Sequence, residues 1–277
     1  ATGEPVVTPT QDFVWGLWYM TRNIEPGATE RAVADHTDAK ALFARDHIAV
    51  NDPLSIPAHA VPTLKGVDAG GMYTTSVGRL LFNEMFPVDI AYRNDAVAKN
   101  VIHEMIKLMI DTHGFAETAE LLDHIKEVSL LHLTRSGNSW GIEDLPILKN
   151  KPAIIAHAEG EVEDIRKLWE EGYLTASEKR NKTTEVWIAT KEKIVTEARG
   201  AFSRHSSVFS MVSSQARGSW TQLTQIVGMK GLVTNPAGEI IELPVISSFQ
   251  EGFSVLEYFI SSHGARKGLS DTALRTA

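Results

Sequence analysis

The sequence predicts a mainly α-helical protein with small β elements, an α+β fold class. Several segments place apolar side chains every three or four residues, the spacing that puts them on one face of a helix. The segments that resemble strands are short and bounded by Pro, Gly or Asn, which limits them to small hairpins. The 277 residues are 43% apolar and 22% charged, a composition typical of globular proteins, and they include no cysteine.

The N-terminal half is expected to hold short elements first and helices later. Residues 1–62 are rich in Pro and Thr, so we expect strands, turns and one short helix there, around the apolar stretch 13–20. Helices are predicted for Thr74–Phe86, Ala96–Ile110 and Ala116–Leu131. In the second of these, apolar side chains recur every four residues, namely at Val97, Val101, Met105 and Met109.

An antiparallel helical hairpin is predicted between residues 154 and 199. Its first arm carries one apolar stripe and ends at Gly172, and Thr175 with Glu178 then forms a capping box that starts the second arm. Because the other faces are strongly polar, we expect the hairpin to project from the body of the protein. The stripes consist of Ile154, Ala158, Val162, Ile165 and Trp169 in the first arm, and Trp187, Ile194 and Ala198 in the second.

The C-terminal part is expected to begin with a loop at Gln215–Ser219, followed by a β-hairpin over Val233–Val245. Ser248 and Glu251 match a second capping box, which predicts that a long helix begins there. After Ser261 this helix loses its apolar stripe, so it is not built to lie on a hydrophobic core.

The glycines and cations of this last helix suggest contact with a polyanion. Gly264 and Gly268 each cost about 1 kcal/mol relative to Ala, so something must offset them. They can allow a bulky partner to approach the backbone, or allow the helix to bend as a hinge, although a helix that simply frays at its glycines would look the same. Beside them lie residues suited to phosphates and to a flat base pair, namely Arg266, Lys267, Arg275, Thr276 and Ala277.

The charge distribution agrees with this location. The net charge is −8, but it is −9 over residues 1–200 and +1 over 201–277. There is neither an export signal nor a run of 18 apolar residues, so we expect no membrane association. The lack of cysteine fits the reducing cytoplasm. Without an initiator Met or a C-terminal helix stop, both ends look cut.

The segment Ser247–Ala277 closely resembles the bridge helix of the largest catalytic (beta-prime) subunit of bacterial DNA-dependent RNA polymerase. The resemblance covers nearly the whole chain through motifs in the same order, namely Gly3-Glu-Pro-Val6, Gly16-Leu-Trp-Tyr-Met-Thr-Arg22, Thr75-Ser-Val-Gly-Arg79, Leu81-Phe-Asn-Glu84, Thr134-Arg-Ser-Gly137, Asn181-Lys182, Ala216-Arg-Gly-Ser219 and Gly228-Met-Lys-Gly-Leu232. It implies a part of a larger subunit that carries out template-dependent RNA synthesis, a nucleotidyltransferase reaction of transcription.

The resemblance also implies three regions. Residues 1–150 would form the pore region that lines the secondary channel for nucleotides. Residues 151–205 would form the funnel hairpin at the channel rim, where regulatory factors dock. Residues 206–277 would hold the loop region that supports the active site, the β-hairpin and the start of the bridge helix. The implied partners are the beta, alpha, omega and sigma subunits, the DNA template, the RNA transcript and nucleoside triphosphates.

Individual roles follow from the same resemblance. Arg217 matches an arginine that faces the nucleotide triphosphate, for which a bidentate guanidinium is well suited. Arg266, Lys267 and Arg275 match positions near the nucleic-acid backbone, while Thr276 and Ala277 match those facing the template base pair.

Two departures from the family pattern concern the active centre. Ser213 and Gln215 stand where the family usually has Asp and Gly, so we expect a different local backbone near Arg217. The aspartate motif that holds catalytic Mg²⁺ in the family is missing, and we expect it just upstream of Ala1. We therefore expect no catalytic residue and no metal ligand in this chain, which alone should be inactive.

Two further patterns suggest other chemistry but lack the context it needs. Gly137-x-Ser139-x-Gly141 fits an esterase nucleophile elbow, yet Pro146 follows where a helix should begin. His103-Glu104 starts a zinc-binding helix pattern, but Lys107 replaces its second histidine. The alternative to a polymerase function is a non-catalytic helical module that binds partner proteins through the 154–199 hairpin.

Overall fold

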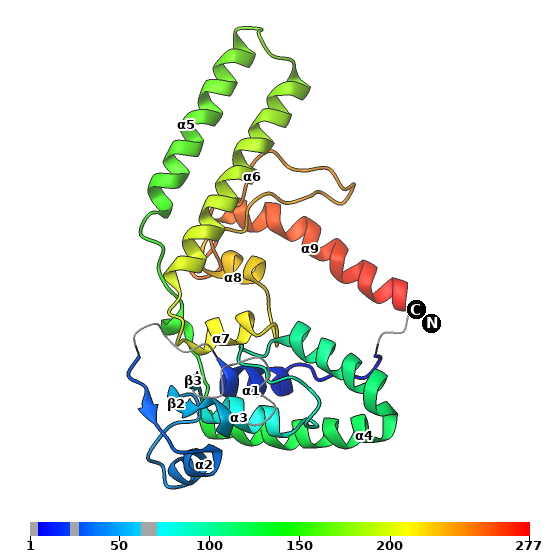
Figure 1. Ribbon diagram of the computed structural model, residues 1–277. Helices are drawn as coiled ribbons and strands as arrows, with labels where there is room; N and C mark the ends of the chain where they lie inside the picture. Colours follow the sequence, from blue (N-terminus) through cyan, green and yellow to red (C-terminus); the bar gives the residue numbers. More distant parts are fainter. Residues whose placement is uncertain (1–4, 23–27, 62–70) are drawn as a thin grey trace. The chain divides into compact units, whose positions relative to one another are not determined.

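The computed structural model describes residues 5–22, 28–61 and 71–277. The chain divides into two compact units, Ala1–Ser139 with Ser207–Arg217 and Trp140–Ser206 with Gly218–Ala277. Both are mainly helical with small β elements, so the predicted fold class is confirmed (Figure 1). Residues 3 and 4 of the first motif, and residues 1, 2, 23–27 and 62 of the first predicted region, lie outside the described residues.

The first unit is built on the packing of α1 (Asp12–Thr21) against α4 (Lys99–Ser136). Their contact is close because Gly16 has no side chain: a Cβ there would lie only 2.2 Å from the carbonyl oxygen of Ser129. Around this contact lies a hydrophobic core that includes Val14, Leu17, Phe82, Ile102, Met105, Ile106 and Ile125.

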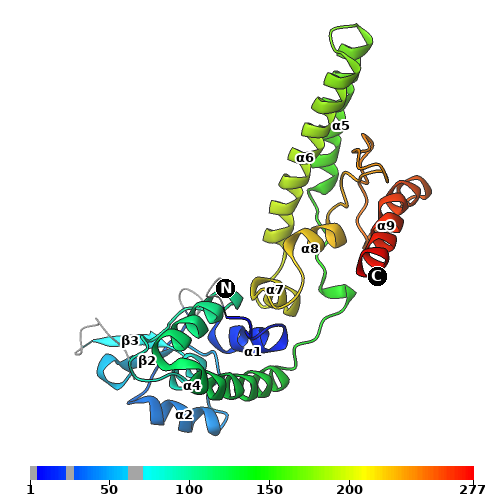
Figure 2. The ribbon, with the colours of Figure 1, turned by 90° about the vertical axis from the view of Figure 1, so that its right-hand side faces the viewer.

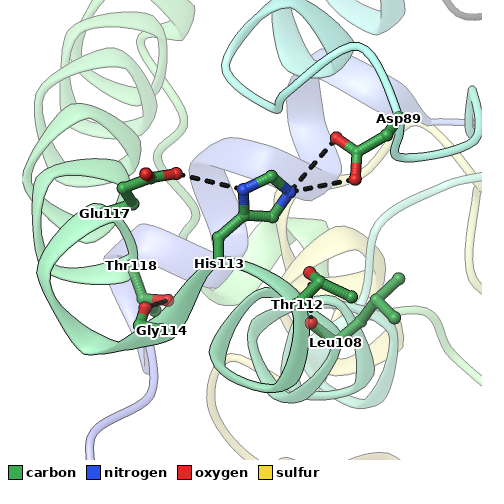
Figure 3. Close-up of polar contacts among 7 residues, drawn as sticks. All are labelled: Asp89, Leu108, Thr112, His113, Gly114, Glu117 and Thr118. Carbon is green, nitrogen blue, oxygen red and sulfur yellow. Dashed lines mark hydrogen bonds and ion pairs between the residues drawn. The ribbon is translucent and has the colours of Figure 1, made fainter.

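Helix α4 has two arms that meet at Gly114, whose φ of 79° lies outside the helical region. The arms correspond to the two helices predicted at Ala96–Ile110 and Ala116–Leu131. His113 lies beside the break, and its ring nitrogens are 3.0 Å from carboxylate oxygens of Asp89 and Glu117 (Figure 3). The imidazole thus joins both sides of the break to the loop after α3.

A three-stranded sheet with the order β1-β2-β3 completes the first unit, together with two helices. Strand β1 (Arg31–Ala32) is parallel to β2 (Leu54–Pro57), which is antiparallel to β3 (Met72–Thr75). The helices α2 (His36–Ala44) and α3 (Val77–Glu84) pack against each other. A hydrophobic cluster joins these elements, and it includes Val33, Ala39, Leu54, Ile56, Val77 and Leu80.

Arg79 is a buried charge that fixes the end of α1. Its guanidinium donates to the carbonyl oxygens of Thr21 and Arg22 and to the side chain of Asn94. A cation at a helix C-terminus satisfies carbonyls that have no partner within the helix. One helical turn later, the Asn83 side chain holds the backbone of Arg93: its amide donates to the Arg93 carbonyl oxygen and accepts from the Arg93 backbone N–H.

The second unit contains the predicted helical hairpin, formed by α5 (Lys151–Glu170) and α6 (Ala176–Ala201), which lie side by side in both views (Figures 1 and 2). The capping box of Thr175 and Glu178 is present, with both reciprocal hydrogen bonds. Residues 166–173, at the tip, are all exposed. The buried stripe of α6 includes the predicted Trp187, Ile194 and Ala198, whereas α5 buries Ile155 and Ala158.

The remaining elements follow the hairpin along the chain. Helix α7 (Ser207–Ser213) belongs to the first unit, while α8 (Trp220–Val227) and α9 (Val255–Thr276) belong to the second. The predicted β-hairpin is present as a short irregular ladder, in which Gly231 pairs with Val245 and Thr234 with Ile240. We call residues 231–245 the connecting hairpin. The two 3-10 helices are η1 (Ala58–Ala60) and η2 (Ile142–Asp144).

Three element predictions were wrong in detail. Residues 5–61 hold two α-helices and not one, because Asp35 caps α2 through the backbone N–H of Asp38. Thr74 and Thr75 belong to β3, and α3 starts only at Val77. The long C-terminal helix starts at Val255 and not at Ser248.

The segment around Ser139 does not form a nucleophile elbow, as its sequence context predicted. Gly137 ends α4 in the left-handed conformation, with φ of 61°, and the segment continues into η2 without a strand before it. A nucleophile elbow requires a strand before the serine and a helix after it. The segment is therefore a polar turn.

Candidate nucleic-acid interface

Arg217 lies in an exposed loop whose base is firmly held. The hydroxyl of the buried Ser214 donates to the carbonyl oxygen of Met211 at 3.0 Å and accepts from the backbone N–H of Ala216 at 3.3 Å. Ala216 itself belongs to the hydrophobic core of the first unit. Among the residues that the structure describes, the Arg217 guanidinium forms no hydrogen bond or ion pair, so it is presented to solvent on a fixed base.

The departure at Gln215 is accommodated by an unusual backbone conformation. Gln215 has φ of 62°, in the left-handed region that glycine adopts without strain and other residues adopt at a cost of about 1 kcal/mol. This is the position at which the family usually has Gly. Gln215 thus forms a left-handed turn just before Arg217, and the expected difference from the family's local backbone stays a prediction.

Helix α9 buries very little of its surface within this chain. Only Ile260 and Ser261 are buried, and the large apolar side chains that remain exposed are Val255, Leu256, Tyr258, Phe259, Leu269 and Leu274. The expectation that this helix does not lie on a hydrophobic core is confirmed within the described residues. Its predicted interface residues, Arg266, Lys267, Arg275, Thr276 and Ala277, are all exposed.

The start of α9 is held by a carboxylate that accepts several hydrogen bonds. Glu257 forms a capping box with Ser254, and it also accepts from the backbone N–H of Ser247 at 2.8 Å and from the Ser247 hydroxyl at 2.9 Å. Partial burial raises the pKa of Glu257, but these hydrogen bonds outweigh that effect and lower it to about 2.

The predicted box at Ser248 and Glu251 also exists, but it closes a turn instead of starting a helix. Glu251 accepts from the Ser248 backbone, and the Ser248 hydroxyl accepts from the Glu251 backbone. Gly252 then has φ of 83°, so the chain cannot continue as a helix. Glu251 also pairs with Lys151, the first residue of α5, which attaches this turn to the base of the helical hairpin.

Lys230 is a further cation that the sequence analysis did not find. Its ammonium lies 5.7 Å from the ring centre of Phe249 and 5.6 Å from that of Phe253, which is cation–π geometry. Burial lowers its pKa. The sequence does not indicate this contact, because the four-residue spacing of Phe249 and Phe253 is also typical of one face of a helix. Neither residue lies in α9.

The two glycines of α9 have different surroundings. A Cβ on Gly264 would lie 3.1 Å from the carbonyl oxygen of Thr234 in the connecting hairpin, whereas a Cβ on Gly268 would meet no described atom within 4 Å. The first glycine therefore allows a backbone to approach, as the sequence suggested, and the backbone belongs to this chain. Helix α9 continues through both glycines without a break, so their hinge role stays a prediction.

Lys267 and Arg266 also differ in their contacts. The Lys267 ammonium donates to the carbonyl oxygen of Pro236 at 2.5 Å, at the turn of the connecting hairpin. For Arg266 and Arg275, the described part of the chain supplies no partner. The interface cations lie in the second unit, and Arg217 lies in the first.

The residues that the structure describes do not fit a magnesium site. Among residues 5–22, 28–61 and 71–277, no group of three or more His, Asp or Glu side chains converges in a way that could hold a metal ion. Two-metal phosphoryl transfer requires such a carboxylate cluster. No helix within the same ranges is long and apolar enough to span a membrane.

We expect the two glycines to respond differently to alanine. Gly268→Ala should stabilise α9 by about 1 kcal/mol, because alanine is the better helix former and its Cβ meets open space. Gly264→Ala should stabilise α9 by less than this or destabilise it, because its Cβ presses on the Thr234 carbonyl. Hydrogen exchange of the α9 amides measures both local opening free energies. An equal gain at both positions would contradict the close approach at Gly264.

We also expect Glu257 to make stability depend on pH. Its pKa is about 2 in the folded chain against an ordinary value of 4.5, so its contribution is present above pH 4.5 and is lost as the pH falls toward 2. Glu257→Gln should remove this dependence and lower stability at neutral pH by about 1 kcal/mol, as expected for a lost cap. Urea unfolding at several pH values measures it. Parallel pH curves for both proteins would refute this role.

Comparison with known proteins supports the family that the sequence resembles. The model of the family "RNA polymerase Rpb1, domain 3" matches residues 1–145, and that of "RNA polymerase Rpb1, domain 4" matches residues 159–254. Together they cover residues 1–145 and 159–254, so residues 146–158 and α9 lie outside both matches.

Curated relatives extend the match through α9. The chain is 39% identical over 275 residues to the DNA-directed RNA polymerase subunit beta' of Desulforudis audaxviator, which covers 99% of this chain and 23% of the relative. It is 38% identical to that of Acidothermus cellulolyticus, with 100% and 22% covered, and 36% identical to that of Caldicellulosiruptor saccharolyticus, with 100% and 25% covered. The chain thus spans about a quarter of the length of these relatives. Because the domain 3 model alone matches more than half of its residues, the chain belongs to the RNA polymerase Rpb1 family.

Proposed function

We propose that this chain acts as part of the beta-prime catalytic subunit of a bacterial DNA-directed RNA polymerase, a nucleotidyltransferase that transcribes DNA. The observation that carries this proposal is the match of 99–100% of the chain to three such subunits. The exposed helix α9 supports it, because a helix with so little core of its own suits a larger assembly.

In this assembly, α9 would contact nucleic acid with its cationic side. Arg266 and Arg275 are exposed and free of partners in the described part of the chain, so each can neutralise a phosphate. Thr276 and Ala277 follow at the end of the helix, where small side chains leave room for a base pair. The hydroxyl of Thr276 is already occupied, since it donates to backbone oxygens of Thr272 and Ala273. Thr276 would therefore have no free hydroxyl proton to donate to the base pair.

Arg217 would bind the triphosphate of the incoming nucleotide. A guanidinium stays charged at any physiological pH and can donate two parallel hydrogen bonds to phosphate oxygens. Hydrogen bonds at Ser214 and Ala216 already order the backbone next to Arg217, so binding need not order it. Its role is to hold and orient the triphosphate, while Mg²⁺ would be bound by residues outside this chain.

The α5–α6 hairpin would present a docking surface for regulatory factors at the rim of the nucleotide channel. Its tip is exposed, and its acidic first arm is largely paired within the helix, as in Lys167 with Asp164 and Arg166 with Glu170. Such exposed pairs contribute little stability, so they can be exchanged for a partner's charges. The pore region, the beta, alpha, omega and sigma subunits, and a cytoplasmic location belong to the same proposal.

The function can be tested by mutating Arg217 in the assembled polymerase. Arg217→Ala should raise the apparent KM for nucleoside triphosphates by about tenfold or more, because a charged hydrogen bond to phosphate is lost. The apparent KM of Arg217→Lys should lie between those of the wild type and Arg217→Ala, since an ammonium keeps the charge without the bidentate geometry.

A control separates binding from folding. Arg204→Ala removes a charge from another exposed arginine, which lies in the second unit and outside the proposed site, and it should leave KM unchanged. A defect of Arg217→Ala in subunit assembly alone, with unchanged KM, would contradict the nucleotide role. Absence of RNA synthesis by the assembled wild-type enzyme would instead favour a non-catalytic interaction module.

A further inference from the structure

The connecting hairpin touches both the α5–α6 hairpin and α9. In Figure 1 it is the orange segment that lies between α6 and α9. These are three separate elements of the second unit, and the sequence analysis did not relate them. Polar and backbone contacts join the connecting hairpin to its neighbours on each side.

On the α6 side, two cations hold the second strand of the connecting hairpin. Lys179 pairs with Glu242 at 3.0 Å, and Arg180 donates to the carbonyl oxygen of Ile240 at 2.6 Å. Lys179 also lies 5.1 Å from the ring centre of Trp169 in α5, so the contact includes both arms of the helical hairpin. These residues lie toward the tip of that hairpin.

On the α9 side, the first strand and the turn make contact at one helical turn. The Thr234 carbonyl lies close to Gly264, where a Cβ would be only 3.1 Å from its oxygen and would require a small shift. One turn later, Lys267 donates to the carbonyl oxygen of Pro236. The two contacts together fix both the position of α9 along its axis and its rotation.

The connecting hairpin itself is braced at its turn. The Asn235 side chain exchanges hydrogen bonds with the side chain and backbone of Glu239, and the Gly238 backbone N–H donates to the Asn235 carbonyl. Pro236 fixes one backbone angle of the same turn. Because these hydrogen bonds brace the turn, we expect a displacement of Ile240 or Glu242 to move Thr234 and Pro236 with it.

We propose that the connecting hairpin mechanically couples the α5–α6 hairpin to the glycine turn of α9, and that Lys267 is a positioning residue in this coupling. The proposal rests on the proposed function, since it assigns a route by which a partner bound to the α5–α6 hairpin changes the rate of RNA synthesis. It gives Lys267 a role toward this chain's own backbone in place of a phosphate contact.

The test is a double-mutant cycle in the assembled polymerase, with the elongation rate at saturating nucleotides as the readout. Lys267→Met and Arg180→Met each remove one end of the coupling, and each should lower the rate by about threefold or more. The double variant should be no slower than the slower single variant, because either change alone already uncouples the elements.

Lys182→Met is the matched control on α6. It removes a charge two residues beyond Arg180, at an exposed lysine for which the described structure shows no contact with the connecting hairpin. Its effect should be small and should multiply with that of Lys267→Met. Lys267→Arg should restore most of the rate, because a guanidinium can also donate to the Pro236 carbonyl.

The salt dependence of nucleic-acid binding distinguishes the two roles of Lys267. A positioning residue leaves the slope of log affinity against log salt unchanged, whereas loss of a phosphate contact reduces it by about one. A reduced slope for Lys267→Met, or independent effects in the double variant, would overturn the proposal.

Two further arms keep the outcome unambiguous. If Lys267→Met prevents assembly, Gly264→Ala replaces it, because its Cβ disturbs the Thr234 contact without removing a charge; independent effects with Arg180→Met would again overturn the coupling. The wild-type enzyme must synthesise RNA in the same assay, and its failure to do so would refute the proposed function itself.

Discussion

A 22-residue helix with almost no hydrophobic core of its own is the constraint on which the rest of the second unit depends. Helix α9 buries only Ile260 and Ser261, so burial of apolar surface can stabilise little beyond its first turns. What holds it are polar and backbone contacts at one side and one end. Glu257 fixes the start, and the connecting hairpin fixes the turn that contains Gly264. Beyond Lys267, the Arg275 guanidinium has no partner among the residues that the structure describes.

Close approaches at glycine are the means by which both units position their helices. Gly16 admits the carbonyl of Ser129, Gly78 admits that of Met20, and Gly264 admits that of Thr234. At Gly16 and Gly78 a Cβ would collide with backbone, whereas at Gly264 it would make a tight contact that requires a small shift of the Thr234 carbonyl. Glycine thus lowers the helix propensity, but it permits a closer approach between elements than any other residue does. In α9 this closer approach gives a physical reason for one of the two glycines that weaken the helix.

Sequence patterns identified the elements whose signals are local. The capping box at Thr175 and the stripe of α6 appear in the structure, because each depends on residues within one or two turns. The stripe predicted for α5 was largely wrong: of its five residues only Ala158 is buried, and Trp169 is exposed. The same reasoning was wrong at Ser248, where the capping box is present but no helix begins. A capping box reports a local turn, and whether a helix follows is decided by Gly252 and by the stronger cap at Ser254.

Contacts between distant residues could not be predicted in this way. Gly264 and Thr234 are 30 positions apart, Lys230 contacts Phe249 and Phe253, and His113 contacts Asp89 in the loop after α3. None of these pairs has a spacing that periodicity can detect. The proposed roles of Arg217 and of the α9 cations come from the family resemblance, and the structure shows which contacts hold the backbone of these segments.

The most direct test of this account is the rate of trypsin cleavage within α9, compared between the 277-residue chain and the assembled polymerase. Cleavage after a helical residue requires local unfolding. In the chain alone, sites after Arg266 and Lys267 should be cut well before sites after Lys193 and Arg199 in α6, whose helix buries Trp187 and Ile194. In the assembly, the α9 sites should become protected. Equal resistance of α9 and α6 in the chain alone would contradict the account.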